Sequence, residues 1–176
     1  MGTDNYCKAC TSCTKNWSLD RVTNCHDFCE EYQNWKRPKN GVYLAGSIDR
    51  VTPEFALEWR KKARIFLEEH GYVVLDPTEG KNLHEHNIDH KNYTKQTAWD
   101  NIVSPDLIKI KKASILLVEI SKKNCPYHGT SMELVYGNTW GKTVVVWGDV
   151  KSAWVVYHST IILPTLDDAL EYIIGR

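Results

Sequence analysis

The sequence has no excess of charge of either sign, because 22 lysine and arginine residues balance 22 aspartate and glutamate residues. A neutral chain has no broad electrostatic attraction to nucleic acid or to an anionic membrane. No apolar run is long enough to cross a bilayer, and the start, MGTDNYCKAC, lacks the apolar stretch of a signal peptide. These absences predict a cytoplasmic protein whose partners include neither membranes nor nucleic acid and whose thiols stay reduced.

Two common nucleotide-binding signatures are also missing. The turn GSID, residues 46–49, has one glycine where a dinucleotide fingerprint has three, and the chain has no Walker loop. A Gly-Ser turn before a helix can still bind an anion through its backbone amides. A simple tight turn would have the same sequence, so both interpretations stay open.

Cysteine is nearly absent after residue 29, where Cys125 alone remains. The others lie close together near the start: Cys7, Cys10, Cys13, Cys25 and Cys29. In a reducing compartment, thiolates at this spacing favour a structural Zn²⁺ site, while C-x2-C-x2-C also permits an iron–sulfur cluster and free thiols need no metal. We expect residues 1–37 to form a zinc-binding segment, with one cysteine more than a tetrahedral site uses.

The remaining part, residues 38–176, follows a charged Pro/Gly turn and alternates apolar runs with helical patterns. Short apolar runs predict about five strands: VYLAGS, YVVLDP, SILLVEI, KTVVVWG and STIIL. Helices are predicted at residues 52–71, at 99–112 with a restart at Ser104–Pro105, around Glu133 and at 165–175, with a long polar loop at 79–98. This alternation indicates an α/β fold, in which a parallel sheet is flanked by helices.

The stretch YHGTSMELVYG, residues 127–137, permits two interpretations of Glu133. Thr130 and Glu133 have the spacing of a capping box, which closes the start of a helix. Alternatively, Glu133 is a reactive carboxylate near the carboxyl end of a strand, where α/β proteins place their sites. Two further residues also have structural interpretations. Asp106 would complement the dipole of its helix, and Tyr43 would be an aromatic residue of the core.

Three blocks of the chain resemble the nucleoside 2-deoxyribosyltransferase family and its relatives, the nucleotide N-glycosidases: VYLAGSI, SPDLIKIKKASILLVEI and GTSMELVYGNTWGKTVVV. The resemblance spans about residues 41–176, and G-T-x-x-E-L followed by G-K-x-V is its specific part. It implies a flavodoxin/Rossmann-like fold and an enzyme that cleaves or transfers the N-glycosidic bond of a 2′-deoxynucleoside or its 5′-monophosphate. It also implies a homodimer or higher homo-oligomer with shared active sites.

The resemblance implies catalytic roles for three residues. Glu133 matches the nucleophile that attacks C1′, Asp106 matches the residue that positions and protonates the base, and Tyr43 matches the residue that orients the nucleophile. The chemistry agrees, because an oxocarbenium-like state is stabilised by a nearby carboxylate and a heterocyclic base leaves more readily when protonated. No cofactor is expected for catalysis.

Substrate contacts are expected around the first strand and the Glu133 helix. The turn GSI resembles the nucleotide hydrolases, so Ser47 is a candidate phosphate ligand assisted by Arg50. Tyr127 stands where many transferases carry a base-holding aspartate. Further expected contacts are Gly46, Asp76, Gly129, Thr130 and Met132, with Trp154 and His158 reaching a substrate across a subunit interface.

An alternative of another class is a catalytically silent nucleotide-binding module whose cysteine-rich head contacts protein or nucleic acid. A pure binder has no need of two carboxylates beside an electron-rich ligand, so Glu133 together with Asp106 favours an enzyme. The nucleobase and the acceptor, water or a second base, stay open.

Overall fold

The computed structural model describes residues 40–48, 51–80, 83 and 94–176. The cysteine-rich segment and its junction at residue 37 lie outside the described residues, so the division of the chain into two parts stays a prediction. In the part that is described, no helix is both long and apolar enough to cross a membrane.

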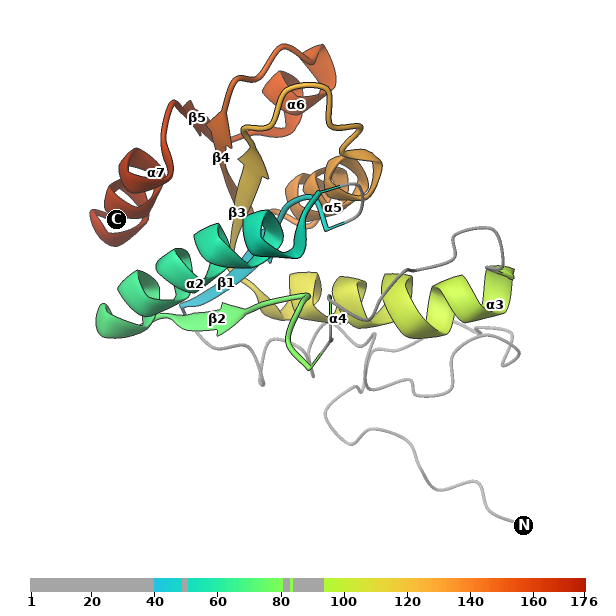
Figure 1. Cartoon of the computed structure of the whole chain (residues 1–176). Coiled ribbons are helices and arrows are strands. Elements are labelled where there is room, and N and C mark those ends of the chain that lie inside the picture. The colour runs from blue at the N-terminus through green and yellow to red at the C-terminus, as the bar shows by residue number, and fades with distance from the viewer. Residues whose placement is uncertain (1–39, 49–50, 81–82, 84–93) are drawn as a thin grey trace, which may run out of the picture. The chain divides into compact units, whose positions relative to one another are not determined.

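Five parallel strands form one sheet in the order β2-β1-β3-β4-β5 (Figure 1). They are β1 (Gly41–Ala45), β2 (Val73–Leu75), β3 (Ile115–Ile120), β4 (Thr143–Gly148) and β5 (Ile161–Leu163). The predicted α/β fold with a parallel sheet is therefore confirmed. The strand order reverses beside β1, and in open α/β sheets ligands bind at the carboxyl ends of the strands at such a point. The ends of β1 and β3 are thus the place to look for a site.

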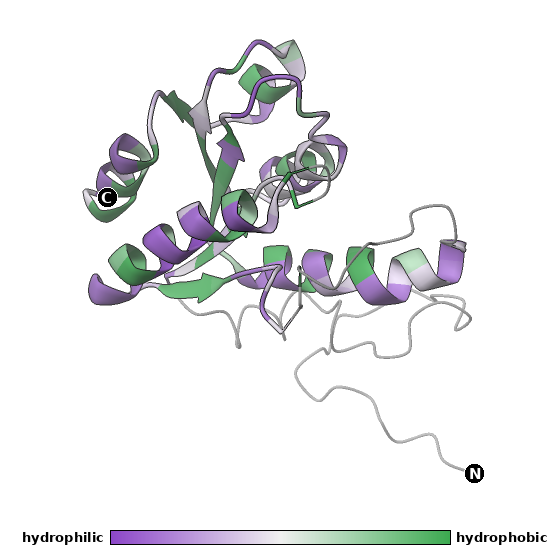
Figure 2. Cartoon of the chain, viewed as in Figure 1, coloured by the Kyte–Doolittle hydropathy of each residue, from purple (hydrophilic) through white to green (hydrophobic). Residues whose placement is uncertain are grey.

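The helices cover both faces of this sheet. They are α2 (Pro53–Glu69), α3 (Lys95–Ala98), the π-helix η3 (Trp99–Val103), α4 (Ser104–Lys112), α5 (His128–Thr139), α6 (Ala153–His158) and α7 (Leu166–Ile174). The strands consist mostly of apolar residues (Figure 2), and their side chains join two buried clusters in which the helices take part. The β3 strand is buried from Ile115 to Glu119, as predicted for a strand covered on both sides.

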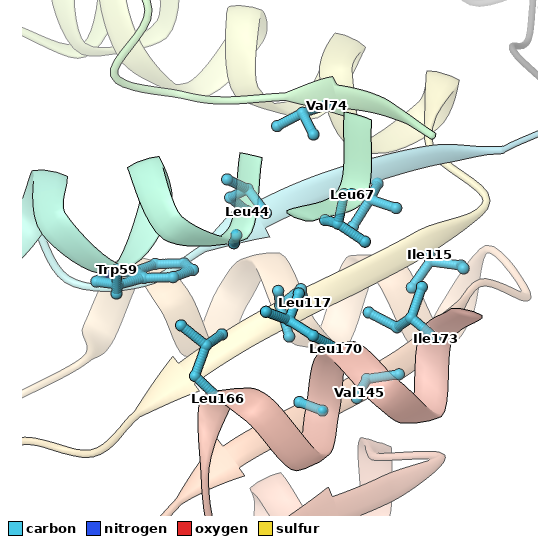
Figure 3. Close-up of a cluster of buried hydrophobic side chains, with 13 residues drawn as sticks. Leu44, Trp59, Leu67, Val74, Ile115, Leu117, Val145, Leu166, Leu170 and Ile173 are labelled. Atoms are coloured by element: carbon cyan, nitrogen blue, oxygen red, sulfur yellow. The ribbon is translucent and has the colours of Figure 1, made fainter. Parts of the chain in front are cut away.

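Alternation along β1 decides which residues face which helices. Val42 and Leu44 point to α2 and α7, where they join Trp59, Leu67 and Leu170 in one apolar cluster (Figure 3). The intervening residues belong to a second cluster, with α4, α5 and α6. That second cluster comprises Tyr43, Ala45, Ile110, Ala113, Leu116, Val118, Leu134, Val144, Val146 and Val155. Tyr43 therefore points toward the two helices that carry Asp106 and Glu133.

The helix that carries Asp106 starts earlier than predicted and contains a wider turn. Residues 95–112 are helical without a break, so the end of the predicted 79–98 loop is helical instead. Pro105 has no N–H to donate and its ring opposes a regular helical turn, which accounts for the π-helix before it. The predicted restart at Ser104–Pro105 is this change from π to α geometry.

Helix α2 begins as predicted. The Thr52 side chain accepts a hydrogen bond from the Phe55 amide at 3.3 Å, and Pro53 occupies the first turn. The short helix α6 was not predicted, because six residues of mixed apolar and polar character have no clear period.

Candidate active site

A hydrogen bond joins Tyr43 to Glu133 across 90 residues of chain. The Tyr43 hydroxyl donates to Glu133 Oε1 at 2.6 Å, from β1 to the second turn of α5. Tyr43 is fully buried and Glu133 is partly exposed. A buried phenol thus fixes one oxygen of a carboxylate that solvent can still reach.

The electrostatics of this pair keep the phenol protonated. Burial, then the Glu133 charge and then the Asp106 charge raise the pKa of Tyr43 well above its usual value. The hydroxyl therefore keeps its proton through the neutral range and stays a donor to Glu133. Asp106 is therefore near enough to this pair to act on it electrostatically.

Asp106 is buried within the long helical segment and does not cap it. Residues 95–103 precede α4 in helical conformation, and the Ser104 amide bonds to the Trp99 carbonyl. Since helical residues precede α4, its first turn is not the exposed start of a helix whose dipole an acid would complement. The structural interpretation of Asp106 thereby loses its basis.

The capping-box interpretation of Glu133 is wrong. Helix α5 begins at His128, so Thr130 lies inside the first turn and Glu133 in the next. The residue before the helix, Tyr127, has a left-handed backbone with φ of 43° and gives no side-chain cap. Glu133 is directed to Tyr43 and not back to the helix start.

The Gly46–Ser47 turn at the end of β1 is tightly enclosed. A Cβ added to Gly46 would lie 2.7 Å from Trp59 Cζ2 and 3.0 Å from Glu119 Cβ. A side chain at this position would therefore displace the packing between β1, α2 and β3. Ser47 is buried, and the Cys125 thiol donates to its hydroxyl at 3.2 Å.

Two buried charged residues near this turn were not predicted. Arg60 of α2 is 1% exposed and Glu119 of β3 is fully buried. Each had a signal in the sequence: Arg60 lies on the apolar face of its helix, and Glu119 interrupts the apolar run SILLVEI. A charge within an apolar pattern indicates a buried, partnered group.

Tyr127 is engaged within the protein. Its hydroxyl donates to Glu119 Oε1 at 2.7 Å and accepts a hydrogen bond from the Lys122 amide at 2.9 Å. Burial, followed by the hydrogen bond to Glu119, raises the pKa of Tyr127. Ser121 donates to the same carboxylate oxygen through its amide and hydroxyl. This network fixes the segment between β3 and α5.

Asp76 likewise has partners within the protein. Its Oδ1 accepts hydrogen bonds from the Thr78 amide and hydroxyl, and both oxygens lie within 4 Å of arginine nitrogens of α2. Asp76 directly follows β2, at the carboxyl end of that strand. As a substrate contact it stays a prediction.

The remaining expected substrate contacts are spread over α5 and α6. Thr130 is buried in the first turn of α5, while Gly129 and Met132 are exposed. Trp154 is 72% exposed, and His158 is buried with Nδ1 donating to the Trp154 carbonyl at 2.8 Å. Arg50 lies outside the described residues.

The five cysteines of the expected zinc site also lie outside the described residues, so that site stays a prediction. Elemental analysis of protein purified without added metal is expected to give about one zinc per chain, because a tetrahedral thiolate site binds one ion. Iron with visible absorbance would favour the cluster instead. Protein without metal, and with freely titrating thiols, would contradict both.

Known proteins similar to this chain include one protein family and two solved structures. A family model described as nucleoside 2-deoxyribosyltransferase matches residues 42–161. A 2-deoxyribosyltransferase from Bacillus psychrosaccharolyticus shares the fold at 21% identity and a TM-score of 0.56, covering 75% of this chain and 91% of that one. A CMP N-glycosidase from Clostridium botulinum has 18% identity and a TM-score of 0.49, over 77% and 99% of the two chains. None of the curated protein sequences compared with the chain matches it.

Proposed function

The chain belongs to the nucleoside 2-deoxyribosyltransferase family, and on that premise we propose that it breaks the N-glycosidic bond of a 2′-deoxynucleoside 5′-monophosphate with Glu133 as nucleophile. The observation that carries the proposal is the 2.6 Å hydrogen bond from Tyr43 in β1 to Glu133 in α5, a pair on which the Asp106 charge also acts. A pair of carboxylates with one oriented by a buried phenol is suited to covalent glycosidic chemistry.

In the proposed reaction Glu133 attacks C1′ of the sugar as the bond to the base breaks. Tyr43 fixes Oε1, which orients the carboxylate toward the anomeric carbon. Asp106, when protonated, gives its proton to the departing base, which leaves as a neutral heterocycle. Water or a second base then attacks C1′, releases Glu133 and returns a proton to Asp106. Two displacements at C1′ retain the configuration of the sugar.

The preference for a monophosphate is supported by the Gly46–Ser47 turn. A 5′-phosphate carries nearly two negative charges. Backbone amides of this turn and the Ser47 hydroxyl are groups that can bind such an anion. Tyr127 supports the same assignment, because its hydroxyl is already used by Glu119 and the Lys122 amide. Discrimination of the base through that hydroxyl would require breaking one or both of these hydrogen bonds.

The experiment is a panel of deoxynucleosides and their 5′-monophosphates, with release of free base as the measurement. We expect kcat/KM to be higher for the monophosphate, and Ser47→Ala to reduce that advantage by about tenfold, the cost of one hydrogen bond to a charged group. Equal kcat/KM for both forms, or a nucleoside preference that Ser47→Ala leaves intact, would contradict the phosphate assignment. Formation of a new nucleoside on addition of a second base would identify a transferase.

We also propose that the protein assembles as a homo-oligomer. The support is an exposed aromatic surface on α6, where Trp154 and Tyr157 are 72% and 79% exposed. Surfaces rich in exposed aromatics are typical of protein–protein contacts.

A further inference from the structure

A cavity of about 360 Å³ lies at the carboxyl ends of β3 and β4. Residues of the segment between β3 and α5 form one part of its wall, and residues that follow β4 form the other. Three lysines line it, Lys122, Lys123 and Lys151, and they outnumber its one carboxylate, that of Asp149. A cavity in which cations outnumber anions attracts negatively charged ligands.

Buried hydrogen bonds hold this wall of the cavity in place. The Tyr127 hydroxyl donates to Glu119 Oε1 at 2.7 Å, and the Ser121 amide and hydroxyl donate to the same oxygen at 2.6 and 2.7 Å. The Lys122 amide in turn donates to the Tyr127 hydroxyl at 2.9 Å. Tyr127 and Ser121 line the cavity, whereas the carboxylate of Glu119 is fully buried behind them and does not. A wall fixed in this way loses little conformational freedom when a ligand binds.

Two contacts join the cavity wall to the Gly46–Ser47 turn and to the helix that follows it. The thiol of Cys125, which lines the cavity, donates to the Ser47 hydroxyl at 3.2 Å. Lys122 Nζ lies over the ring of Phe55 in the first turn of α2, 4.8 Å from the ring centroid. A cation held against an aromatic ring keeps a defined position. The cavity therefore adjoins the turn, and Lys122 extends from the cavity to α2.

Two of the three ammonium groups are open to a ligand. Lys122 and Lys123 are exposed, and neither forms an ion pair with any residue that the structure describes. Lys151 Nζ lies 3.2 Å from Asp149 Oδ2, and both of these side chains are more than half exposed, so water screens their attraction. An anion from solvent can thus reach Lys122 and Lys123 without displacing a carboxylate.

We propose that this cavity is the subsite for the 5′-phosphate of the substrate, with Lys122 as the cation that binds the phosphate beside Ser47. This rests on the proposed function, in which the Gly46–Ser47 turn binds the phosphate. The turn supplies amides and a hydroxyl, which carry no full charge to set against the two negative charges of a phosphate. An ammonium supplies that charge and forms charge-assisted hydrogen bonds with phosphate oxygens.

Three variants test the role of Lys122. Lys122→Gln removes the charge of an exposed side chain and keeps the backbone amide that binds the Tyr127 hydroxyl, so the wall of the cavity is expected to stay in place. Lys122→Arg keeps a positive charge with N–H donors. Lys61→Gln is the matched control, because it removes the same charge from an exposed lysine of α2 that does not line the cavity.

The first measurement is the binding of 2-deoxyribose 5-phosphate by isothermal titration calorimetry, with 2-deoxyribose as the comparison. This probe carries the sugar and the phosphate without a base, so its binding requires neither catalysis nor the correct nucleobase. Lys122→Gln is expected to weaken its binding by about tenfold, the effect of one hydrogen bond to a charged group, and to leave 2-deoxyribose unaffected. Lys122→Arg is expected to stay within about threefold of wild type, and Lys61→Gln to bind as wild type does.

Competition with inorganic phosphate separates a substrate subsite from an unrelated anion site. Inorganic phosphate is expected to compete with 2-deoxyribose 5-phosphate in wild type and to do so more weakly in Lys122→Gln. Inorganic phosphate that binds through Lys122 without competing would place a separate anion site in the cavity and overturn the proposal. Binding of 2-deoxyribose 5-phosphate that Lys122→Gln leaves unchanged, or that Lys61→Gln weakens equally, would also overturn it.

Base release distinguishes failure of this inference from failure of the proposed function. Lys122→Gln is expected to lower kcat/KM for the monophosphate by about tenfold and to leave kcat/KM for the nucleoside unchanged. If no substrate of the panel releases its base, the proposed function fails, and binding of 2-deoxyribose 5-phosphate still decides whether Lys122 binds a phosphate. If the monophosphate is preferred and Ser47→Ala removes the preference while Lys122→Gln does not, the inference about the cavity fails alone.

Discussion

Glu133→Gln is expected to lower the rate of base release by at least about a thousandfold, with little change in substrate affinity, because the amide cannot act as a nucleophile. Glutamine keeps the length of the side chain, and its amide oxygen can accept the hydrogen bond that Tyr43 now donates to Oε1. Single-turnover release of base measures the rate, and equilibrium binding of the product measures affinity. A variant within tenfold of wild type would contradict the nucleophile assignment.

Tyr43→Phe is the matched control for this prediction. It removes the hydrogen bond to Oε1 and keeps the carboxylate, so a loss of about tenfold is expected from poorer orientation. Helix α5 begins at His128 without using Glu133 as a cap, so Glu133→Gln is expected to melt at nearly the wild-type temperature. If Glu133→Gln and Tyr43→Phe lose activity equally, the hydrogen bond between the two residues accounts for the whole effect, and the nucleophile assignment loses its support.

Most of the fold could be predicted because its signals are local. Each strand is a short apolar run, and Thr52 and Pro53 indicate where helix α2 begins. The order β2-β1-β3-β4-β5 has no such signal, since strand neighbours are chosen by packing between distant segments. The π-helix before Pro105 was only indicated as a restart, because the spacing of residues does not show how a helix accommodates the missing amide.

The candidate site also contains some features that the sequence indicated and others that it did not. The resemblance supplied Tyr43, Asp106 and Glu133. In the structure Tyr43 donates a hydrogen bond to Glu133, and the Asp106 charge acts on that pair. The capping-box spacing of Thr130 and Glu133 misled because the helix starts three residues earlier, with Tyr127 and not Thr130 at the N-cap. Tyr127 has a left-handed backbone, which tyrosine rarely adopts. The position of Arg60 on the apolar face of α2 was visible in the sequence, but its partners Gly46 and Asp76 were not, because they lie in other segments of the chain.

Asp106 and Glu133 act at different moments of the proposed reaction, which makes their variants distinguishable. Glu133 is needed for every substrate, because it forms the bond to C1′. Asp106 is needed only when the leaving group requires a proton. Asp106 is a buried carboxyl on α4 whose charge acts on Tyr43, and this supports its proposed role as the proton donor.

Asp106→Asn is therefore expected to slow release of the natural base by about a hundredfold, the lower range for loss of a general acid, and to spare an activated substrate. The measurement compares the natural substrate with the same 2-deoxyribosyl group carrying 4-nitrophenolate, which leaves as a stable anion without protonation. Asp100→Asn is the control, because Asp100 is exposed in the preceding π-helix and accepts hydrogen bonds from Gln96. A selective loss on the natural base, absent in Asp100→Asn, identifies Asp106 as the proton donor. An equal loss on both substrates would instead assign Asp106 a structural role in holding α4 against the site.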